Sequence, residues 1–410
     1  MSADLFVNEF PYGRVGLIEL SDGRLLTMTP DWSAATSADG GRTWSESPLA
    51  DAAQRDPWLW NPSLVRLESG VLVLQVLRQN DKGHMSMACC RSADEGRSWS
   101  DEHAINLPGA TASPYHDAMI ATESGRLVLP VRACFAGRES GQAGEKAMGT
   151  VRGEASIVEG HAQYPEIDIA SAYFSDDQGQ TWESTRYEII CWPDNGARGA
   201  YAVDEPCVAE TAPGTLLMAA RSTIGRIVTS TSDDNGASWS RGLPTDLCNS
   251  YSPARLVRIP GTFEVLLVWN QVSPEEIRRG FRRSRLTSAV STDGGATWGS
   301  FKLLDCADPL DPVAHVEPGE PPSFVVARRE CGELPANYCI FRYPNVDFAD
   351  GNAYITYDRE TFIYTGSPRR VRALRVTPIE TLREDGPWDL RLSNDIPLGI
   401  ESADRESNED

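Results

Sequence analysis

Apolar runs and turns alternate along the chain in a pattern that occurs six times. Each copy has an apolar run, a turn with glycine, or Pro-Gly, and a second apolar run, as in NPSLVRLESGVLVLQV (61–76) and EPCVAETAPGTLLMAA (205–220). The other four copies lie at 14–28, 116–131, 252–269 and 343–357. Apolar runs on both sides of a tight turn predict β-hairpins whose strands are buried on both faces.

Five octapeptides, each placed after a hairpin, share the pattern S-x-D-x-G-x-[TS]-W. They read SADGGRTW, SADEGRSW, SDDQGQTW, SDDNGASW and STDGGATW and start at residues 37, 92, 175, 232 and 291. In each box we expect the Asp to accept N–H groups across a turn, the Gly to adopt a positive φ, and the Trp to pack between neighbouring sheets. Six hairpins at this spacing predict an all-β fold, a six-bladed β-propeller of four-stranded antiparallel blades.

The sixth hairpin has no octapeptide, so its blade must be completed differently. We expect RVRALRV (370–376) to follow it and LFVNEF (5–10) to close the ring from the other end of the chain. No linker or composition break divides the sequence, which predicts a single domain over 1–402 and a disordered acidic tail at 403–410.

Composition then narrows the classes of function. A net charge of −21 argues against nucleic acid and anionic membranes as partners, and no segment resembles a signal peptide or a membrane span. The nine cysteines are scattered without metal-ligand spacing, which indicates a reduced, cytoplasmic protein without a metal or organic cofactor.

Candidate functional residues lie at the open ends of the hairpins, on the face opposite the octapeptides. Folding each hairpin at its turn pairs Arg14 with Asp31, Asn61 with Arg78, His116 with Arg132, Glu205 with Arg221, Ser252 with Asn270, and Tyr343 with Asp358. Arg283 is expected to join this rim from the third strand of blade five, with Arg285 as its competitor. Residues of these types act in catalysis or binding more often than the residues of ordinary loop ends do.

The octapeptides and the rim residues together resemble the sialidase (neuraminidase) superfamily, the family 33-like glycoside hydrolases. DEPCVAETAPGTLLMAAR matches the fourth-blade pattern of that family and gives Glu205 and Arg221, while YGRVGLIEL gives Arg14, with Val-Gly where the family has Ile-Pro. The third family arginine corresponds to Arg283 and the family tyrosine to Tyr343.

The resemblance implies an exo-acting, retaining glycosidase that releases a terminal sialic acid or related ulosonic acid from an acidic carbohydrate. Arg14, Arg221 and Arg283 would hold the sugar carboxylate, and Glu205 would be the base for the nucleophile Tyr343. Further substrate-binding candidates are Asn61, Arg78 and Arg132.

The general acid is where the sequence departs from the family. The loop that carries the family's aspartate is short here, TMTPDWSAAT, and Asp31 is its one acid. The alternative proton donor is the pair His116 and Asp117 on blade three, since histidine titrates near neutrality.

That departure leaves two other classes of function open. A propeller lyase on uronic-acid polysaccharides would use His116, Tyr343 and Arg132, and a non-catalytic carbohydrate-binding propeller would need no activated tyrosine. Two long insertions, 136–166 and 306–337, lead onto the rim; the first is a candidate lid, specificity loop or subunit contact of a homo-oligomer.

Overall fold

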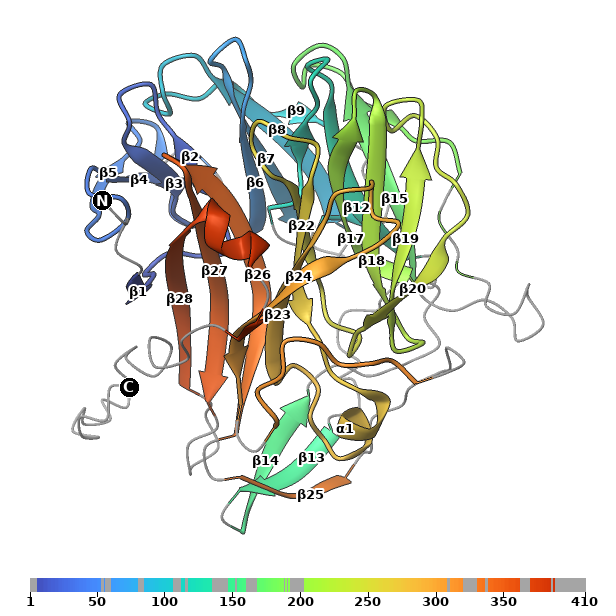
Figure 1. Cartoon of the computed structure of the whole chain (residues 1–410). Coiled ribbons are helices and arrows are strands. Elements are labelled where there is room, and N and C mark those ends of the chain that lie inside the picture. The colour runs from blue at the N-terminus through green and yellow to red at the C-terminus, as the bar shows by residue number, and fades with distance from the viewer. Residues whose placement is uncertain are drawn as a thin grey trace.

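Six four-stranded antiparallel blades arranged around a central axis make up the molecule, as the sequence predicted (Figure 1). The structure is a computed structural model that describes residues 6–52, 55, 60–79, 85–105, 112–114, 117–134, 147–151, 153–159, 168–187, 189, 191, 203–307, 310–319, 330–335, 338–361, 369–384 and 386–387. Within these ranges, no helix is long and apolar enough to span a lipid bilayer.

The first three blades follow one another along the chain. Blade one contains β2 (Ile18–Glu19), β3 (Leu25–Met28), β4 (Ser33–Ser37) and β5 (Ser45–Pro48). Blade two contains β6 (Trp60–Arg66), β7 (Leu72–Gln79), β8 (Met85–Ser92) and β9 (His103–Ala104). Blade three contains β10 (Ala112–Ser113) and β11 (Ile120–Ala121), which both pair with β12 (Leu127–Cys134), then β15 (Asp168–Ser175) and β16 (Glu183–Ser184).

The last three blades complete the ring. Blade four contains β17 (Val203–Ala212), β18 (Thr215–Ser222), β19 (Arg226–Ser232) and β20 (Leu243–Cys248). Blade five contains β21 (Arg255–Arg258), β22 (Val265–Asn270), β23 (Arg285–Ser291) and β24 (Gly299–Cys306), with β29 (Gly386–Pro387) added in parallel to β24. Blade six contains β26 (Cys339–Ala349), β27 (Asn352–Thr361), β28 (Arg369–Pro378) and β1 (Phe6–Glu9).

The ring closes through β1, which confirms the closure expected from the sequence. β1 pairs antiparallel with β28, with Phe6 opposite Val376 and Glu9 opposite Ala373. The first described residues thus complete the blade formed by the last long hairpin, so both ends of the chain stabilise one sheet.

The hydrophobic core lies between blades rather than inside one. Six buried clusters each join two neighbouring blades; for example, one joins Leu26 and Met28 of blade one to Leu72 and Leu74 of blade two. Inner strands therefore bury both faces, which explains their continuous apolar runs.

The octapeptides, here called Asp boxes, form the corners between the third and fourth strands. In the first box, Ser37 Oγ accepts from Gly41 N at 2.8 Å, and Asp39 accepts from Thr43 N at 2.8 Å and Thr43 Oγ at 2.6 Å. Gly295 of the fifth box has φ +92°, and a Cβ there would lie 2.3 Å from Leu217 of the preceding blade. Glycine is required there for both conformation and space.

The tryptophan of each box joins the cluster between its own blade and the preceding one, as expected. The boxes also lie away from the candidate rim, because Ser232 is opposite Leu216 next to the β17–β18 turn, whereas Arg221 is near the other end of β18.

The two long insertions contribute to one additional sheet. Its strands are β14 (Glu154–Glu159), β13 (Ala147–Val151) and β25 (Glu330–Leu334), and β13 pairs in parallel with β25. Figure 1 shows this sheet near α1 (Pro274–Arg278), on the side where β26 begins. A 3-10 helix, η3 (Ile379–Arg383), follows β28.

Candidate active site

Three inner strands break their register at equivalent places on the rim. In blade two, Trp60 is opposite Leu77 but Ser63 is opposite Gln75. In blade four, Asp204 is opposite Arg221 but Cys207 is opposite Ala219; in blade six, Arg342 is opposite Asp358 but Asn345 is opposite Thr356. Each break contains a residue followed by proline: Asn61-Pro62, Glu205-Pro206 and Tyr343-Pro344. Because proline has no N–H to give to the ladder, a bulge at this position is physically reasonable.

In blades four and six the residue before the proline has a positive φ, +46° at Glu205 and +51° at Tyr343. Such a conformation is unfavourable for a residue with a side chain and is retained where the surroundings enforce it, often at functional sites. The two residues expected to act as base and nucleophile therefore occupy the same strained position in two different blades.

These bulges correct three of the expected pairings. Glu205 is not opposite Arg221, and Tyr343 is not opposite Asp358; the partners are Asp204 and Arg342. Asn61 is not opposite Arg78, because it lies in the bulge between Trp60, which is opposite Leu77, and Ser63, which is opposite Gln75. The extra residue in each inner strand shifts the register between the turn and the rim.

A buried ionic group surrounds Glu205. Arg221 Nη2 donates to Asp204 Oδ2 at 2.5 Å, and Arg221 Nε lies 3.0 Å from Glu205 Oε2. Arg132 Nη1 lies 3.6 Å from Asp204 Oδ2. The guanidinium of Arg221 also lies 4.3 Å from the ring centre of Tyr251, so the group is enclosed on that side.

The two acids of this group have opposite pKa shifts. Burial, together with the charge of Asp204, raises the pKa of Glu205 to about 7, although Arg221 opposes the shift. Burial would also raise the pKa of Asp204, but the charges of Arg221 and Arg132 outweigh it and lower that pKa. Asp204 therefore stays ionised, while Glu205 can take up or release a proton near neutrality.

Tyr343 lies against two arginines. The guanidinium carbon of Arg14 is 3.6 Å from the centre of its ring, and that of Arg283 is 5.7 Å away. Arg14 donates to Asp358 Oδ2 from Nε at 3.0 Å and from Nη2 at 2.7 Å, and Arg372 donates to the other oxygen at 2.7 Å.

Arg283 connects the two halves of the site. Its carbonyl accepts from Phe341 N at 2.7 Å, which places the segment before β23 beside the start of β26. The charge of Arg283 also opposes the rise in the pKa of Glu205, so Arg283 is close to both candidate catalytic residues.

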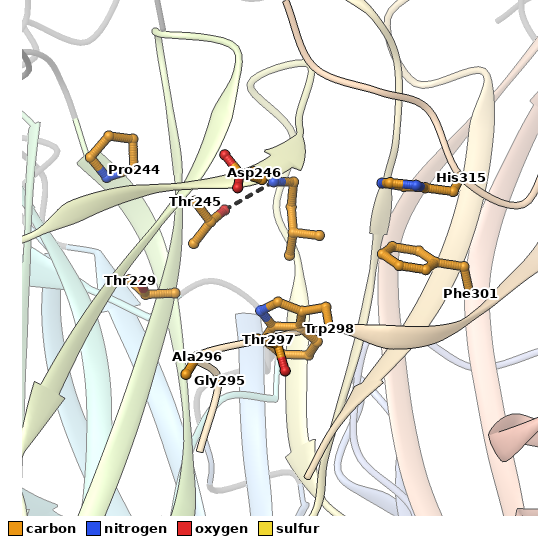
Figure 2. A pocket seen from close by; sticks show the side chains of 11 residues that line it. Thr229, Pro244, Thr245, Asp246, Gly295, Ala296, Thr297, Trp298, Phe301 and His315 are labelled. Carbon is orange, nitrogen blue, oxygen red and sulfur yellow. Dashed lines mark hydrogen bonds between the residues drawn. The ribbon is translucent and has the colours of Figure 1, made fainter. Parts of the chain in front are cut away.

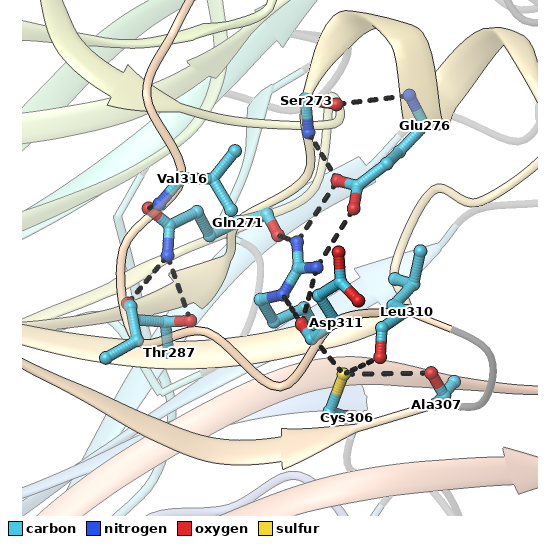
Figure 3. Close-up of polar contacts among 11 residues, drawn as sticks. Gln271, Ser273, Glu276, Thr287, Cys306, Ala307, Leu310, Asp311 and Val316 are labelled. Atoms are coloured by element: carbon cyan, nitrogen blue, oxygen red, sulfur yellow. Dashed lines mark hydrogen bonds and ion pairs between the residues drawn. The ribbon is translucent and has the colours of Figure 1, made fainter. Parts of the chain in front are cut away.

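Arg285, the competitor of Arg283, has a different role. It is 1% exposed; its Nη2 donates to Glu276 Oε1 at 2.9 Å and to the carbonyl of Asp311 at 2.9 Å. Figure 3 shows Glu276 in turn contacting Ser273, the N-cap of α1. Arg285 thus anchors α1, and Arg283 is the arginine of this segment that lies beside Tyr343.

Asp31 does not lie where the hairpin folding placed it. Arg14 pairs with Asp358, and Asp31 occupies the exposed turn between β3 and β4, where it accepts a hydrogen bond from Thr29. That turn is closed by Thr29 N donating to Ser33 O at 2.9 Å, which ends the hairpin short of Arg14. The Thr29 hydroxyl lowers the pKa of Asp31, which makes it a poor proton donor.

Asp117 is another correction, because it is buried on the axis instead of lying on the rim. It accepts from Leu64 N at 2.9 Å, and its Oδ2 lies 3.7 Å from Arg255 Nη2. A Cβ on Gly16 would lie 2.1 Å from that same oxygen, so Asp117 packs directly against blade one. We conclude that Asp117 joins blades and is not exposed to substrate.

The remaining candidates are separate from the central group or lie outside the described residues. Ser113, not His116, is opposite Arg132, because the inner strand of blade three is interrupted between β10 and β11. Arg78 pairs with Glu102 and lies 5.8 Å from the Trp32 ring centre. His116 and the side chain of Asn61 lie outside the described residues.

The sequence does not reveal the two acids that hold the arginines, Asp204 and Asp358, the partner of Arg372. It predicts Asp358 only as the residue opposite Tyr343, and it gives Asp204 no role although that residue precedes Glu205. The signal that would have found Asp204 is Pro206, since a proline inside a buried strand indicates a bulge and a shifted register.

This arrangement is able to bind an anion and to transfer a proton. The central group contains five guanidiniums, of Arg14, Arg132, Arg221, Arg283 and Arg372, against the carboxylates of Asp204, Glu205 and Asp358. It retains positive charge even with Glu205 ionised. Among the described residues, no cluster of His, Cys, Asp and Glu is suited to a metal ion.

Comparison with known proteins places this site in context. Residues 29–354 match the BNR repeat-like domain family. No curated protein matches the sequence. A structure of unknown function from Dyadobacter fermentans is 15% identical, with a TM-score of 0.54, over 92% of this chain and 98% of the other.

Two sialidase structures are also similar in fold. The NanB sialidase of Streptococcus pneumoniae is 13% identical with a TM-score of 0.52, over 89% of this chain and 68% of its own. A mutant of Trypanosoma rangeli sialidase that displays trans-sialidase activity is 14% identical with a TM-score of 0.51, over 90% of this chain. This chain spans 54% of the length of that trypanosomal sialidase.

Proposed function

Because the chain belongs to the BNR repeat-like domain family, we propose that it is a glycoside hydrolase of the sialidase type. Its substrate would be a terminal sialic acid or related ulosonic acid sugar, cleaved with retention. The observation that carries this proposal is that Tyr343 lies against Arg14 and Arg283, and that the charge of Arg283 also acts on the buried Glu205.

The positive charge of the site supports an acidic substrate. The whole chain carries −21, which repels anions at long range, so a carboxylated sugar needs a local cluster of arginines to bind. Arg14, Arg221 and Arg283 approach the Tyr343 and Glu205 region from blades one, four and five. Guanidiniums bind carboxylates through paired hydrogen bonds as well as through charge.

Glu205 and Tyr343 suit the first chemical step. A carboxylate on the anomeric carbon repels an anionic nucleophile, whereas it does not repel a neutral tyrosine hydroxyl. Sialidases use a tyrosine nucleophile. Glu205, with a pKa of about 7, accepts the phenol proton as the tyrosine oxygen bonds to the anomeric carbon and the aglycone departs. Water then attacks that carbon as its bond to the tyrosine oxygen breaks. Glu205 returns its proton to the departing Tyr343 oxygen, and the proton that the water loses goes to the group that protonated the aglycone or to solvent.

The proton donor for the aglycone decides how the function is best tested. The lowered pKa of Asp31 and the interior position of Asp117 argue against both, which leaves His116 as the candidate. Aryl glycosides have leaving groups that depart as phenolates and need little acid assistance, so they test the Tyr343 and Glu205 step alone.

The experiment measures release of the aryl group from aryl α-glycosides of N-acetylneuraminic acid, Kdn and Kdo, with the first-formed sugar anomer followed by NMR. We expect release of the α anomer by the wild-type protein and a loss of about 100- to 10,000-fold in Tyr343→Phe. Tyr354→Phe is the matched control, because Tyr354 lies on the same hairpin near the box end.

Full activity in both Tyr343→Phe and Arg221→Ala would refute the site. An unsaturated product from a uronate polysaccharide, detected in the near ultraviolet, would indicate a lyase instead. Saturable binding of an acidic sugar with neither product would indicate a binding propeller.

A further inference from the structure

A pocket of about 470 Å³ lies on the side of the propeller, between the outer strands of blades four and five (Figure 2). This volume is in the range of small-molecule sites, roughly 300–1,000 Å³. None of its lining residues belongs to the central group. They are Thr229, Pro244, Thr245, Asp246, Leu247, Gly295, Ala296, Thr297, Trp298, Phe301 and His315.

The pocket combines aromatic rings with hydroxyl groups. Trp298 of the fifth Asp box and the stacked pair Phe301 and His315, whose ring centres are 4.0 Å apart, form its apolar surfaces. Figure 2 shows Thr245 and Asp246 on the strand above Trp298, with His315 and Phe301 on the other side. Flat rings with a few polar groups suit a sugar, which has an apolar C–H face and hydroxyl edges.

Both walls of the pocket are held in place by buried polar side chains. Arg226, which is 2% exposed, donates to the Thr245 carbonyl at 2.9 Å, to Asp246 at 3.2 Å and to the Gly319 carbonyl at 2.5 Å. Gln271 accepts from Val316 N at 2.7 Å and donates to the Ala314 carbonyl at 2.9 Å, which fixes the segment that carries His315 (Figure 3). A site whose walls are already fixed loses less entropy on binding.

Trp298 presents its ring rather than its indole N–H to the pocket. The indole N–H groups of Trp44 and Trp182 donate to glycine carbonyls of their own boxes at 3.1 Å. The N–H groups of Trp99, Trp239 and Trp298 are buried without an acceptor among the described residues, so the N–H of Trp298 is not open to a ligand.

The charged side chains at the pocket leave it weakly negative, which disfavours acidic ligands. Asp246 is 93% exposed and paired with Arg226, and Glu317 lies 3.4 Å from His315 and is 85% exposed. Their carboxylates accept hydrogen bonds from hydroxyl groups and repel a carboxylated ligand.

We propose that this pocket between blades four and five binds a neutral sugar residue, at a site separate from the central one. Trp298 and the Phe301–His315 pair contact the apolar face of the sugar. Asp246 accepts hydrogen bonds from the sugar hydroxyl groups, and so do Thr245 and Thr297, whose own hydroxyl hydrogens are donated within the protein. The inference does not depend on the proposed hydrolase activity.

The test is a ligand-observed NMR titration with the methyl glycosides of galactose, glucose and mannose, and with N-acetylneuraminic acid for comparison. We expect at least one neutral glycoside to bind with a Kd in the range of about 1–10 mM. Trp298→Phe, which reduces the aromatic contact surface, and Asp246→Ala, which removes a hydrogen-bond acceptor, are each expected to weaken that binding about three- to tenfold. Trp44→Phe is the matched control, since it makes the same change in a box outside the pocket and should leave the affinity unchanged.

Three results would overturn the proposal. The first is that no neutral glycoside binds saturably up to roughly 100 mM. The second is that the affinity is unchanged in both Trp298→Phe and Asp246→Ala, and the third is that N-acetylneuraminic acid displaces the neutral sugar from the pocket. If Trp298→Phe melts at a lower temperature than wild type, Asp246→Ala and His315→Ala, which alter exposed or half-exposed side chains, decide the outcome.

Discussion

The distinctive feature at the scale of single residues is strain at Glu205 and Tyr343. Both precede a proline in an inner strand and both have a positive φ. The sequence predicts a functional role for both residues but not this conformation, because the bulge depends on strand pairing that is not local. An unfavourable backbone at two candidate catalytic residues is consistent with side chains held in place for chemistry.

Glu205 sets the first prediction. As a base it must be ionised, so kcat/KM should rise with pH through about 7, the value to which burial raises its pKa. Glu205→Gln should abolish this limb and lower kcat/KM by about 100- to 10,000-fold. Glu210→Gln is the control, because Glu210 lies on the same strand near the turn and pairs with Arg258. A wild-type profile that is flat from pH 5 to 8 would rule out the role of Glu205.

The second prediction concerns Asp204 and is a shift of the pH range over which kcat/KM rises, here called the limb. Its charge raises the pKa of Glu205, and it shares Arg221 with Glu205. Asp204→Asn should therefore move the limb to lower pH, with a lower kcat/KM because Arg221 loses an anchor. Asp358→Asn should disturb Arg14 without moving the limb. If both variants have the wild-type limb, the coupling between the two acids is absent.

At the scale of elements, hairpin register next to the turns could be predicted in blades three, four and six. Ile120 opposite Val128, Val208 opposite Met218, and Val346 opposite Ile355 are the pairings that folding at the turn predicts. In blades one, two and five the predicted register is wrong by one residue, since Ile18 is opposite Leu26, Leu64 opposite Leu74, and Arg255 opposite Val268. Towards the rim, bulges or an interrupted strand shift the register further in blades two, three, four and six. The site lies beyond these irregularities, so its residue types could be predicted from the sequence and its pairings could not.

The Asp boxes give a prediction at this scale. Hydrogen bonds from Thr43 lower the pKa of Asp39 to about 2, so the stability that they provide is present above pH 3.8 and is lost as the pH falls towards 2. Asp39→Ala should lower the free energy of unfolding at pH 7 by about 1–2 kcal/mol, measured with denaturant, and leave kcat/KM unchanged. A catalytic defect without loss of stability would mean that the box has a role in the active site.

At the scale of the whole molecule, blades are joined along the axis by buried and partly buried polar groups. Asp347 of blade six accepts from Leu17 N of the blade-one segment at 2.9 Å and from Asn345 Nδ2 at 3.0 Å, close to Asp117. Burial and the charge of Asp117 raise the pKa of Asp347 to about 8. The repeat pattern predicted the blades but not this junction, because its residues come from segments far apart in the chain.

This junction predicts a pH dependence of stability. Between about pH 4 and pH 8 the folded protein retains the Asp347 proton that the unfolded chain releases, so stability falls as the pH rises through this window. Asp347→Asn cannot ionise, so its stability relative to wild type should increase from pH 5 to pH 8. Denaturant unfolding at four pH values measures this, with Asp350→Asn, an exposed neighbour, as the control. Parallel curves for wild type and Asp347→Asn would contradict it.

The central claim is that Tyr343 bonds covalently to an acidic sugar. It is tested most directly by incubating the protein with a 2,3-difluoro derivative of the sugar whose aryl glycoside is cleaved, followed by peptide mass spectrometry. We expect one added sugar on the peptide that contains Tyr343, and no added sugar in Tyr343→Phe. An adduct on another residue, or turnover of the aryl glycoside by Tyr343→Phe at the wild-type rate, would contradict it.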